Sequence, residues 1–142
     1  MISPPSLPLL DVSNVTFRFD DDQDDVIKNI TFDINENENI LVLGPSGSGK
    51  STLAYCMNNL YPASVDGIMS GSIKFRGKEL SSFESGEINK KVGLVMQDPD
   101  SQFCMLTVEE EIAFVLENIQ LPRSEMKERI DYLKIYYENL SP

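Results

Sequence analysis

Histidine is absent from this sequence of 142 residues, and cysteine occurs only twice. Cys56 and Cys104 lie in unrelated surroundings, without the spacing of a metal site. We therefore expect both to be small buried hydrophobic residues in a reducing compartment. No run of about 18 apolar residues occurs, so the sequence predicts no membrane-spanning helix. The apolar start, MISPPSLPLL, has no basic residue and is rich in proline, which does not fit a signal peptide.

Positive charge is also scarce. Lysine and arginine number 12 against 23 acidic residues, which gives a formal net charge of −11. This balance argues against a nucleic-acid partner, because such binding depends on basic side chains that displace counterions from phosphates. Part of the acidic excess lies in one run, DDDQDD, at residues 20–25. We interpret this run as a solvated turn rather than a metal cluster, since such blocks repel one another and stay hydrated.

Five short segments carry strand patterns. Residues 11–19 and 26–34 alternate apolar and polar side chains, which predicts two strands that pair as an antiparallel ribbon. Residues 40–43 and 92–96 are continuous apolar runs, which are typical of parallel strands buried on both faces. Residues 71–80 predict a strand, a glycine turn and a short continuation. Asn37 and Asn39 precede the first apolar run and tolerate the positive φ of a tight turn.

Helical patterns occupy the remaining regions. One helix is predicted after the glycine-rich segment, ending near Leu60 because Pro62 follows Tyr61. A second is predicted over residues 107–120, where Thr107 and Glu110 form a capping-box signature. A third is expected to begin at Ser124 as its N-cap. Residues 1–10 are expected to form an irregular leader.

Residues 44–52, GPSGSGKST, match the pattern Gly-x(4)-Gly-Lys-Ser/Thr of phosphate-binding loops. An apolar run precedes the segment and a predicted helix follows it, which favours this motif over an ordinary Gly-Ser surface loop. The glycines allow backbone amides to face phosphate oxygens, and the helix N-terminus adds its dipole. Lys50 would neutralise phosphate charge, and the Ser51 hydroxyl would bind Mg²⁺. The predicted nucleotide-binding residues of this loop are Gly44, Pro45, Ser46, Gly47, Ser48, Gly49, Lys50, Ser51 and Thr52.

A glutamine, Gln97, follows the second apolar run. In this order of motifs the sequence resembles the ATP-binding cassette (ABC) transporter ATPases, whose first half carries an aromatic A-loop, a Walker A loop and a Q-loop glutamine. The resemblance implies ATP and Mg²⁺ as ligands, with Phe19 stacked on adenine where most members have tyrosine. It also implies that Gln97 contacts Mg²⁺ and, with Lys50, belongs to the catalytic machinery. The alternatives are a core aromatic residue at Phe19 and a solvated strand-end residue at Gln97.

Two further stretches, QDPDSQF at residues 97–103 and TVEEEIAF at residues 107–114, resemble the ATPases of energy-coupling-factor importers. That resemblance implies a peripheral protein at the cytoplasmic face of the membrane, which uses ATP to drive solute uptake. Its implied partners are a transmembrane transporter subunit and a second ABC ATPase domain, in the same chain or a separate one. The predicted helix over residues 107–120 would help to form the docking face for the membrane subunit. Residues 60–73 look like the variety with two cassettes fused in one chain.

The family's later motifs, namely the LSGGQ signature, a Walker B strand ending in Asp-Glu and a switch histidine, do not occur in these residues. We therefore expect residues 11–142 to be the N-terminal portion of one ABC nucleotide-binding domain, truncated before signature and Walker B. The predicted fold is α/β, a P-loop NTPase with a parallel-sheet core and an antiparallel β subdomain. The alternatives are another P-loop NTPase, such as a small-molecule kinase, or a nucleotide-binding module without turnover.

Overall fold

The computed structural model describes residues 7–84 and 86–138. The chain divides into two compact units, Met1–Leu94 and Val95–Pro142. We describe each unit by itself. Among the described residues, no helix combines the length and the apolar character needed to cross a membrane.

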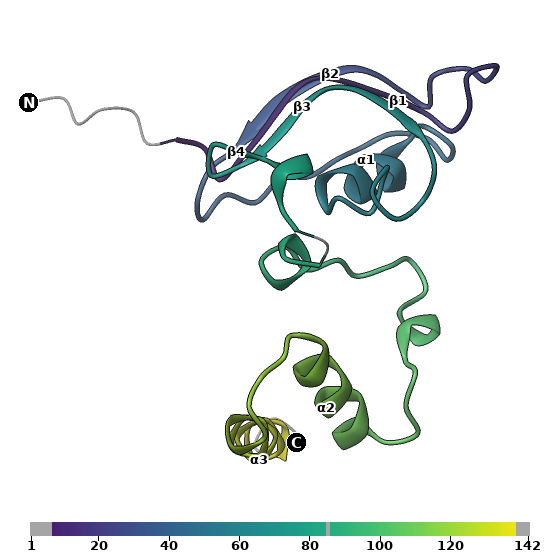
Figure 1. Ribbon diagram of the computed structural model, residues 1–142. Coiled ribbons are helices and arrows are strands. Elements are labelled where there is room, and N and C mark those ends of the chain that lie inside the picture. The colour runs from purple at the N-terminus through teal and green to yellow at the C-terminus, as the bar shows by residue number, and fades with distance from the viewer. Residues whose placement is uncertain (1–6, 85, 139–142) are drawn as a thin grey trace, which may run out of the picture. The chain divides into compact units, whose positions relative to one another are not determined.

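The first unit is built on a four-stranded antiparallel sheet with the order β2-β1-β3-β4 (Figure 1). Its strands are β1 (Leu10–Arg18), β2 (Ile27–Ile34), β3 (Ile68–Phe75) and β4 (Lys78–Glu79). β1 pairs with β2 from Leu10↔Ile34 to Phe17↔Ile27, so the predicted antiparallel ribbon is confirmed. The predicted strand, turn and continuation of residues 71–80 correspond to the end of β3, a turn at Arg76 and Gly77 with positive φ, and β4.

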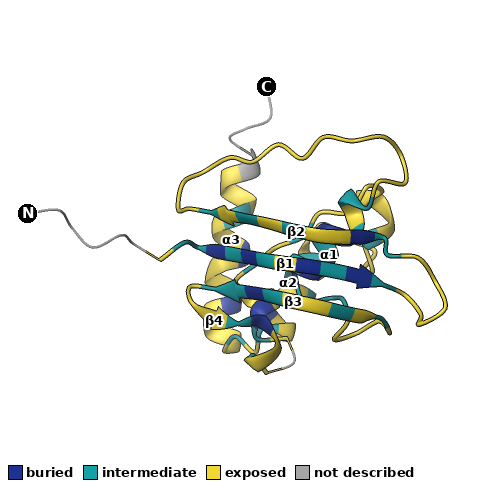
Figure 2. Ribbon diagram, turned by 90° about the horizontal axis from the view of Figure 1, so that it is seen from above, coloured by how far each residue is buried: buried dark blue, intermediate teal, exposed yellow. Residues whose placement is uncertain are grey.

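One face of the central strand β1 forms the core. Val12, Val15 and Phe17 are fully buried in the core cluster. Their strand, β1, lies between β2 and β3 (Figure 2). Helix α1 (Lys50–Met57) lies beneath this curved sheet in Figure 1 and adds the buried side chains of Leu53 and Cys56 to the core. Two short 3₁₀ helices, η1 (Leu80–Ser82) and η2 (Ile88–Lys90), contribute Leu80 and Ile88 to the same cluster.

The prediction of strands at residues 40–43 and 92–96 is wrong, because neither segment is a strand. Leu41 and Leu43 are each 80% exposed, and Val95 is 81% exposed. A strand buried on both faces needs a hydrogen-bonded neighbour and a layer over each face. Among the described residues neither run pairs with a strand of the sheet, and of the second run Val92 packs against the core. Of the two asparagines expected to tolerate a positive φ before the first run, Asn37 has one, at 61°, and Asn39 does not.

The second unit is a helical hairpin preceded by an irregular segment. It contains η3 (Pro99–Gln102), α2 (Val108–Asn118) and α3 (Arg123–Glu138). The predicted capping box of α2 is confirmed: the Thr107 side chain accepts from the Glu110 amide, and the Glu110 carboxylate accepts from the Thr107 amide. Leu116 of α2 packs against Met126 and Ile130 of α3.

Other predictions differ in detail. α3 begins at Arg123, directly after Pro122, so Ser124 lies inside the helix and is not its N-cap. A proline just before the first turn has a φ suited to helix initiation, and the chain therefore turns helical earlier. Cys56 is buried as expected, whereas Cys104 is exposed because it lies in the irregular segment before α2. Of the expected leader, residues 1–6 lie outside the described residues, and Leu10 already belongs to β1.

Candidate nucleotide-binding site

Residues 44–49 form a loop that leads directly into α1 and requires glycine at two positions. Gly47 and Gly49 have φ values of 79° and 85°, in the left-handed region that side chains disfavour. A Cβ atom on Gly49 would also lie 2.7 Å from the carbonyl oxygen of Val26. The loop is therefore packed against the start of β2 in a way that only glycine permits. This contact fixes the phosphate-binding loop to the sheet.

Lys50 is the first residue of α1, and its side chain folds back over the loop. Its ammonium nitrogen lies 2.8 Å from each of the carbonyl oxygens of Gly44 and Pro45, and 3.4 Å from the Ser48 hydroxyl. The Ser48 amide donates to the Pro45 carbonyl, at 3.3 Å, which closes the loop into a turn. The positive charge is thus held at the concave side of the loop, where a phosphate group would meet it.

Ser51 and Thr52 follow in the first turn of α1. Gly49, the N-cap, offers no side chain to the first amides, and the first turn contains no acidic residue. The partial positive charge of this helix end is therefore not neutralised by a neighbouring carboxylate, which favours an anion there. The Ser51 side chain is exposed and supplies one hydroxyl oxygen of the kind that Mg²⁺ accepts as a ligand.

A cavity of about 350 Å³ adjoins the loop. It lies between the start of β2, the apolar run before the loop, and the first turns of α1. Its lining residues are Val26, Ile27, Lys28, Ile30, Val42, Leu43, Gly44, Pro45, Ser48, Gly49, Lys50 and Leu53.

Phe19 lies at the end of β1, in the turn that leads to β2, and is 39% exposed. Arg18 holds this turn through ion pairs with Asp21, at 3.2 Å, and Asp25, at 3.8 Å. The acidic run is accordingly an exposed turn, and among the described residues no group of acidic or cysteine side chains has the arrangement of a metal site. The Val26 amide donates to the Phe17 carbonyl, at 2.8 Å, where β2 begins beside the loop. Phe19 and the phosphate loop thus belong to one unit and share β2 as a support.

Gln97 lies in the second unit and is exposed. Its preceding residue is fixed by a side chain, because the Met96 amide donates to Gln102 Oε1 at 2.9 Å. The Ser101 hydroxyl donates to the Asp98 carbonyl, at 2.7 Å, within the same segment. The structure therefore shows Gln97 in a short closed loop. Lys50 belongs to the first unit, so each of these two predicted site residues is placed within its own unit only.

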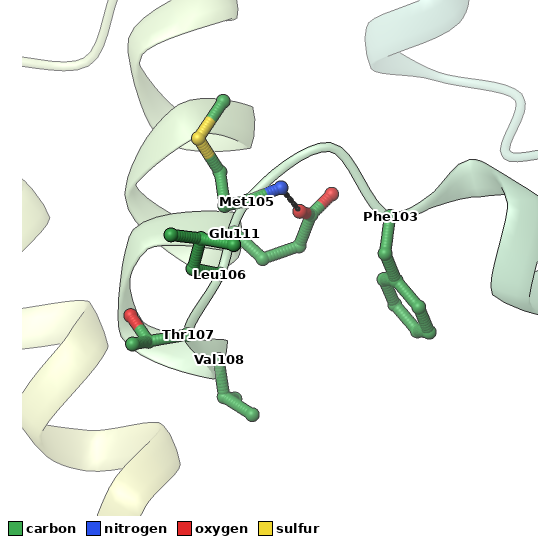
Figure 3. A pocket seen from close by; sticks show the side chains of 6 residues that line it. All are labelled: Phe103, Met105, Leu106, Thr107, Val108 and Glu111. Atoms are coloured by element: carbon green, nitrogen blue, oxygen red, sulfur yellow. Dashed lines mark hydrogen bonds between the residues drawn. The ribbon is translucent and has the colours of Figure 1, made fainter.

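An apolar pocket of about 310 Å³ follows this loop (Figure 3). Glu111 of α2 accepts hydrogen bonds from the amides of Cys104 and Met105, at 2.9 and 2.8 Å, and so folds the preceding segment onto the helix start. Leu106, one of the residues that line this pocket, is 99% exposed. The lining residues are Phe103, Met105, Leu106, Thr107, Val108 and Glu111.

Sequence reasoning missed three residues that hold this architecture together. Asn58 is buried, and its side-chain amide donates to the Val92 carbonyl at 2.7 Å, which ties the segment after η2 to α1. Gln102 and Glu111 fix the segment around Gln97 and before α2. Asn58 binds a backbone group 34 residues away, whereas Gln102 and Glu111 bind backbone amides six or seven residues away. All three are common polar residues, and no periodic pattern marks such contacts. Of the three, only Gln102 could have been noticed from the sequence, because it belongs to the stretch QDPDSQF at residues 97–103.

Comparison with known proteins decides the family. The sequence profile described as "ABC transporter" matches residues 27–140. The chain belongs to the ABC transporter family. The predicted P-loop ABC ATPase fold is confirmed as well, since the chain is similar to a solved structure of CbiO1 from Clostridium perfringens, with a TM-score of 0.70. That match has 30% identity and covers 88% of this chain and 48% of CbiO1.

Curated ABC relatives are more similar in sequence. A Bacillus subtilis protein named "Putative HMP/thiamine import ATP-binding protein YkoD" is 49% identical over 124 residues, covering 87% of this chain and 23% of YkoD. A Clostridium perfringens protein named "Putative ABC transporter ATP-binding protein CPE1583" is 53% identical over 107 residues, covering 75% of this chain and 19% of that protein. The chain thus spans about a fifth of the length of these ABC relatives. A bacterial Atm1-family ABC exporter with ATP bound has a TM-score of 0.55 at 26% identity, covering 69% of this chain and 17% of that one.

Proposed function

We propose that this chain is the nucleotide-binding part of an ABC importer ATPase of the energy-coupling-factor type. The observation that carries the proposal is the glycine loop of residues 44–49 running into α1, with the Lys50 ammonium group held on its concave side. Membership of the ABC family makes ATP the expected ligand. A small-molecule kinase is disfavoured, because the family match extends through the Q-loop region and both helices of the second unit.

The first unit divides the work of nucleotide binding between charge and stacking. Loop amides and Lys50 bind the phosphates, and the residues that would surround them are Gly44, Pro45, Ser46, Gly47, Ser48, Gly49, Ser51 and Thr52. The exposed Phe19 ring stacks on adenine, because each base offers a flat π face to an aromatic side chain.

The residues present fit a magnesium ion in part. Ser51 would hold it through its hydroxyl oxygen. The resemblance to ABC ATPases implies Gln97 as a second ligand, through its side-chain carbonyl oxygen. Mg²⁺ bound there neutralises phosphate charge. Gln97 would also orient the attacking water. Gln97 and Lys50, which neutralises phosphate charge, are therefore the proposed catalytic residues of this chain. Because Gln97 lies in a loop closed by Gln102, a change at the nucleotide can be transmitted toward α2 as a movement of that loop.

The partner of the second unit is a transmembrane transporter subunit. The apolar pocket before α2 supports this assignment, since Leu106 and Val108 are 99% and 75% exposed and lie only a few residues after Gln97. A second ABC ATPase domain, in the same chain or a separate one, is the other expected partner. The protein would act at the cytoplasmic face of the membrane as a peripheral component.

The importer assignment is supported by two relatives. CbiO1 of Clostridium perfringens is described as part of the ABC transporter complex CbiONQ, and the name of YkoD describes HMP/thiamine import. Together with the stretches QDPDSQF and TVEEEIAF, these similarities favour energy-coupled uptake of a small solute over export.

The assignment is tested on the intact protein in its membrane complex. In a Cys104→Ser background, which removes the exposed native thiol, a cysteine placed at Leu106 and a bifunctional thiol crosslinker should yield a product that contains the transmembrane subunit. A cysteine at Asn29, an exposed residue on β2, is the matched control and should not. Products with a second ATPase domain alone would contradict the docking assignment. ATP-dependent solute uptake that Lys50→Ala abolishes would support the importer function, and ATP hydrolysis unaffected by Lys50→Ala would contradict it.

A further inference from the structure

The ring of Phe19 does not stand alone. It lies 5.2 Å from the ring of Phe17 and 5.6 Å from the ring of Tyr61, with interplanar angles of 87° and 80°. Phe17 and Tyr61 are themselves stacked, at 5.3 Å and 8°. The three ring centres therefore form a nearly equilateral triangle. Phe19 contacts both members of a stacked pair at once, and this fixes its tilt as well as its position.

Tyr61 follows α1 and is hydrogen-bonded to the end of that helix. Its backbone amide and that of Leu60 donate to the Tyr55 carbonyl, at 3.3 and 2.9 Å. The rings of Tyr55 and Tyr61 form an edge-to-face pair at 5.2 Å and 74°. Tyr55 belongs to α1, the helix that begins with Lys50. A continuous set of ring contacts thus runs from the helix that carries the phosphate-binding lysine to Phe19.

The other side of this cluster is closed by backbone. A Cβ atom on Gly67 would lie 2.4 Å from the Phe17 ring, so the chain after Tyr61 returns directly against that ring. Phe17 is fully buried, whereas Tyr61 is half-buried and Phe19 is 39% exposed. The exposed part of the cluster is therefore the Phe19 ring, and the Phe17 and Tyr61 rings that support it cannot rotate freely.

From this geometry we infer that Tyr61 is a positioning residue for nucleotide-base recognition. It holds the Phe19 ring at a fixed distance from the helix that binds the phosphates. This inference rests on the proposed function of Phe19 and Lys50. A stacking residue whose ring is already oriented loses less conformational entropy on binding, so the ring contact of Tyr61 strengthens base binding and not phosphate binding.

The experiment separates these two parts of the nucleotide. Dissociation constants of the intact protein are measured by calorimetry for Mg²⁺ with a non-hydrolysable ATP analogue, and for Mg²⁺ with tripolyphosphate, which lacks the base. Tyr61→Ala should weaken binding of the ATP analogue about three- to tenfold, the range expected for loss of aromatic pair contacts. Binding of tripolyphosphate should remain unchanged. Tyr61→Phe should restore binding of the ATP analogue, because the ring and not the hydroxyl makes the contacts.

The matched control is Phe83→Ala. It removes a half-buried ring that forms an edge-to-face pair with Phe75. Phe75 lies at one end of β3, whereas Met69, which pairs with Phe17, lies near the other end. This control should leave the ratio of the two dissociation constants unchanged. In the double variant Phe19→Ala/Tyr61→Ala, binding of the ATP analogue should be no weaker than in Phe19→Ala, since Tyr61 acts through Phe19.

Two results would overturn the inference. One is an equal loss of affinity for both ligands in Tyr61→Ala, which is the behaviour of a residue that merely stabilises the fold. The other is an additive effect of the two substitutions. Should Tyr61→Ala not fold, Tyr61→Leu keeps most of the side-chain volume without the ring and gives the same readings. Failure of the proposed function is a separate outcome, because Lys50→Ala would then leave binding of both ligands unchanged.

Discussion

The ammonium nitrogen of Lys50 lies 2.8 Å from the carbonyl oxygen of Gly44, the first residue of the phosphate-binding loop. The lysine side chain therefore folds back onto the carbonyl groups of the loop, and its charge is positioned to meet a phosphate group. We expect Lys50→Ala to weaken Mg-nucleotide binding by about ten- to 150-fold, the usual effect of a lost hydrogen bond to a charged group. Calorimetry would measure this. Lys91→Ala, which removes an exposed lysine outside the loop, should bind normally.

Gly49 is expected to be the least replaceable residue of the loop. Gly49→Ala would combine a φ of 85° with a Cβ atom 2.7 Å from the Val26 carbonyl oxygen. Gly86→Ala isolates the first effect, because Gly86 has a φ of 78° and no atom within 4 Å of the new Cβ. We expect Gly86→Ala to cost about 1 kcal/mol of unfolding free energy and Gly49→Ala roughly 2 kcal/mol more. Urea denaturation would measure both, and equal costs would show that the contact with β2 yields easily.

The N-terminus of α2 depends on Thr107. Its hydroxyl oxygen accepts from the Glu110 amide at 3.3 Å, and this amide is one of the first in the helix, which have no carbonyl partner within it. Thr107→Ala should therefore lower the unfolding free energy by about 1 kcal/mol. Thr107→Ser keeps the hydroxyl and should cost only a few tenths of that amount. Chemical denaturation followed by helical circular dichroism distinguishes the two variants, and an equal loss in both would assign the effect to the methyl group.

Burial raises the pKa of the Cys56 thiol from 9.0 to about 11. The unfolded chain therefore releases this proton first, and the stabilising contribution is complete below pH 9 and is lost as the pH rises toward 11. The loss amounts to roughly 2 to 3 kcal/mol over that window. The difference in unfolding free energy between the unsubstituted protein and Cys56→Ala should therefore be smaller at about pH 10.5 than at about pH 8. A difference that stays constant with pH would contradict the prediction.

The chain of residues 1–142, taken by itself, is expected to bind Mg-nucleotide weakly and not to turn it over at a useful rate. Lys50, Ser51 and the loop amides supply part of the charge around the phosphates, but no signature loop, Walker B carboxylates or switch histidine occur in these residues. Loss of one preorganised electrostatic group typically costs about 10²- to 10³-fold in rate, and several are missing together. Phosphate release above that of Lys50→Ala would show that the catalytic groups named here are incomplete.

Local patterns predicted the parts of this fold whose partners lie nearby in sequence. The alternation of residues 11–19 predicted β1, and the Thr107–Glu110 spacing predicted the capping box, because both depend on side chains within a few residues. The runs at residues 40–43 and 92–96 were assigned wrongly for the opposite reason. A continuous apolar run shows which side chains a strand would bury. The neighbouring strands and covering layers must come from other parts of the chain, and the run itself does not reveal them.

The residues of the candidate site also divide into those marked by a local pattern and those held by contacts between distant residues. The glycine loop and its lysine are encoded in consecutive residues, and the structure places them together as expected. Tyr61 was predicted only as a place where a helix stops. Its ring contacts with Phe17 and Phe19 connect residues far apart in the chain, and the sequence contains no periodic signal for them. A local motif therefore predicts candidate ligand-binding residues more easily than the residues that pack against them.

The strand order β2-β1-β3-β4 has a consequence for synthesis on the ribosome. All four strands lie within residues 10–79, so every hydrogen-bonded strand pair can form as soon as this stretch has left the exit tunnel. The apolar run of residues 40–43 emerges in the middle of that stretch and gains no neighbour from it, with Leu41 and Leu43 still 80% exposed. A nascent chain would thus present this four-stranded sheet together with an apolar segment that no described strand pairs with, the kind of exposed segment that chaperones bind during translation.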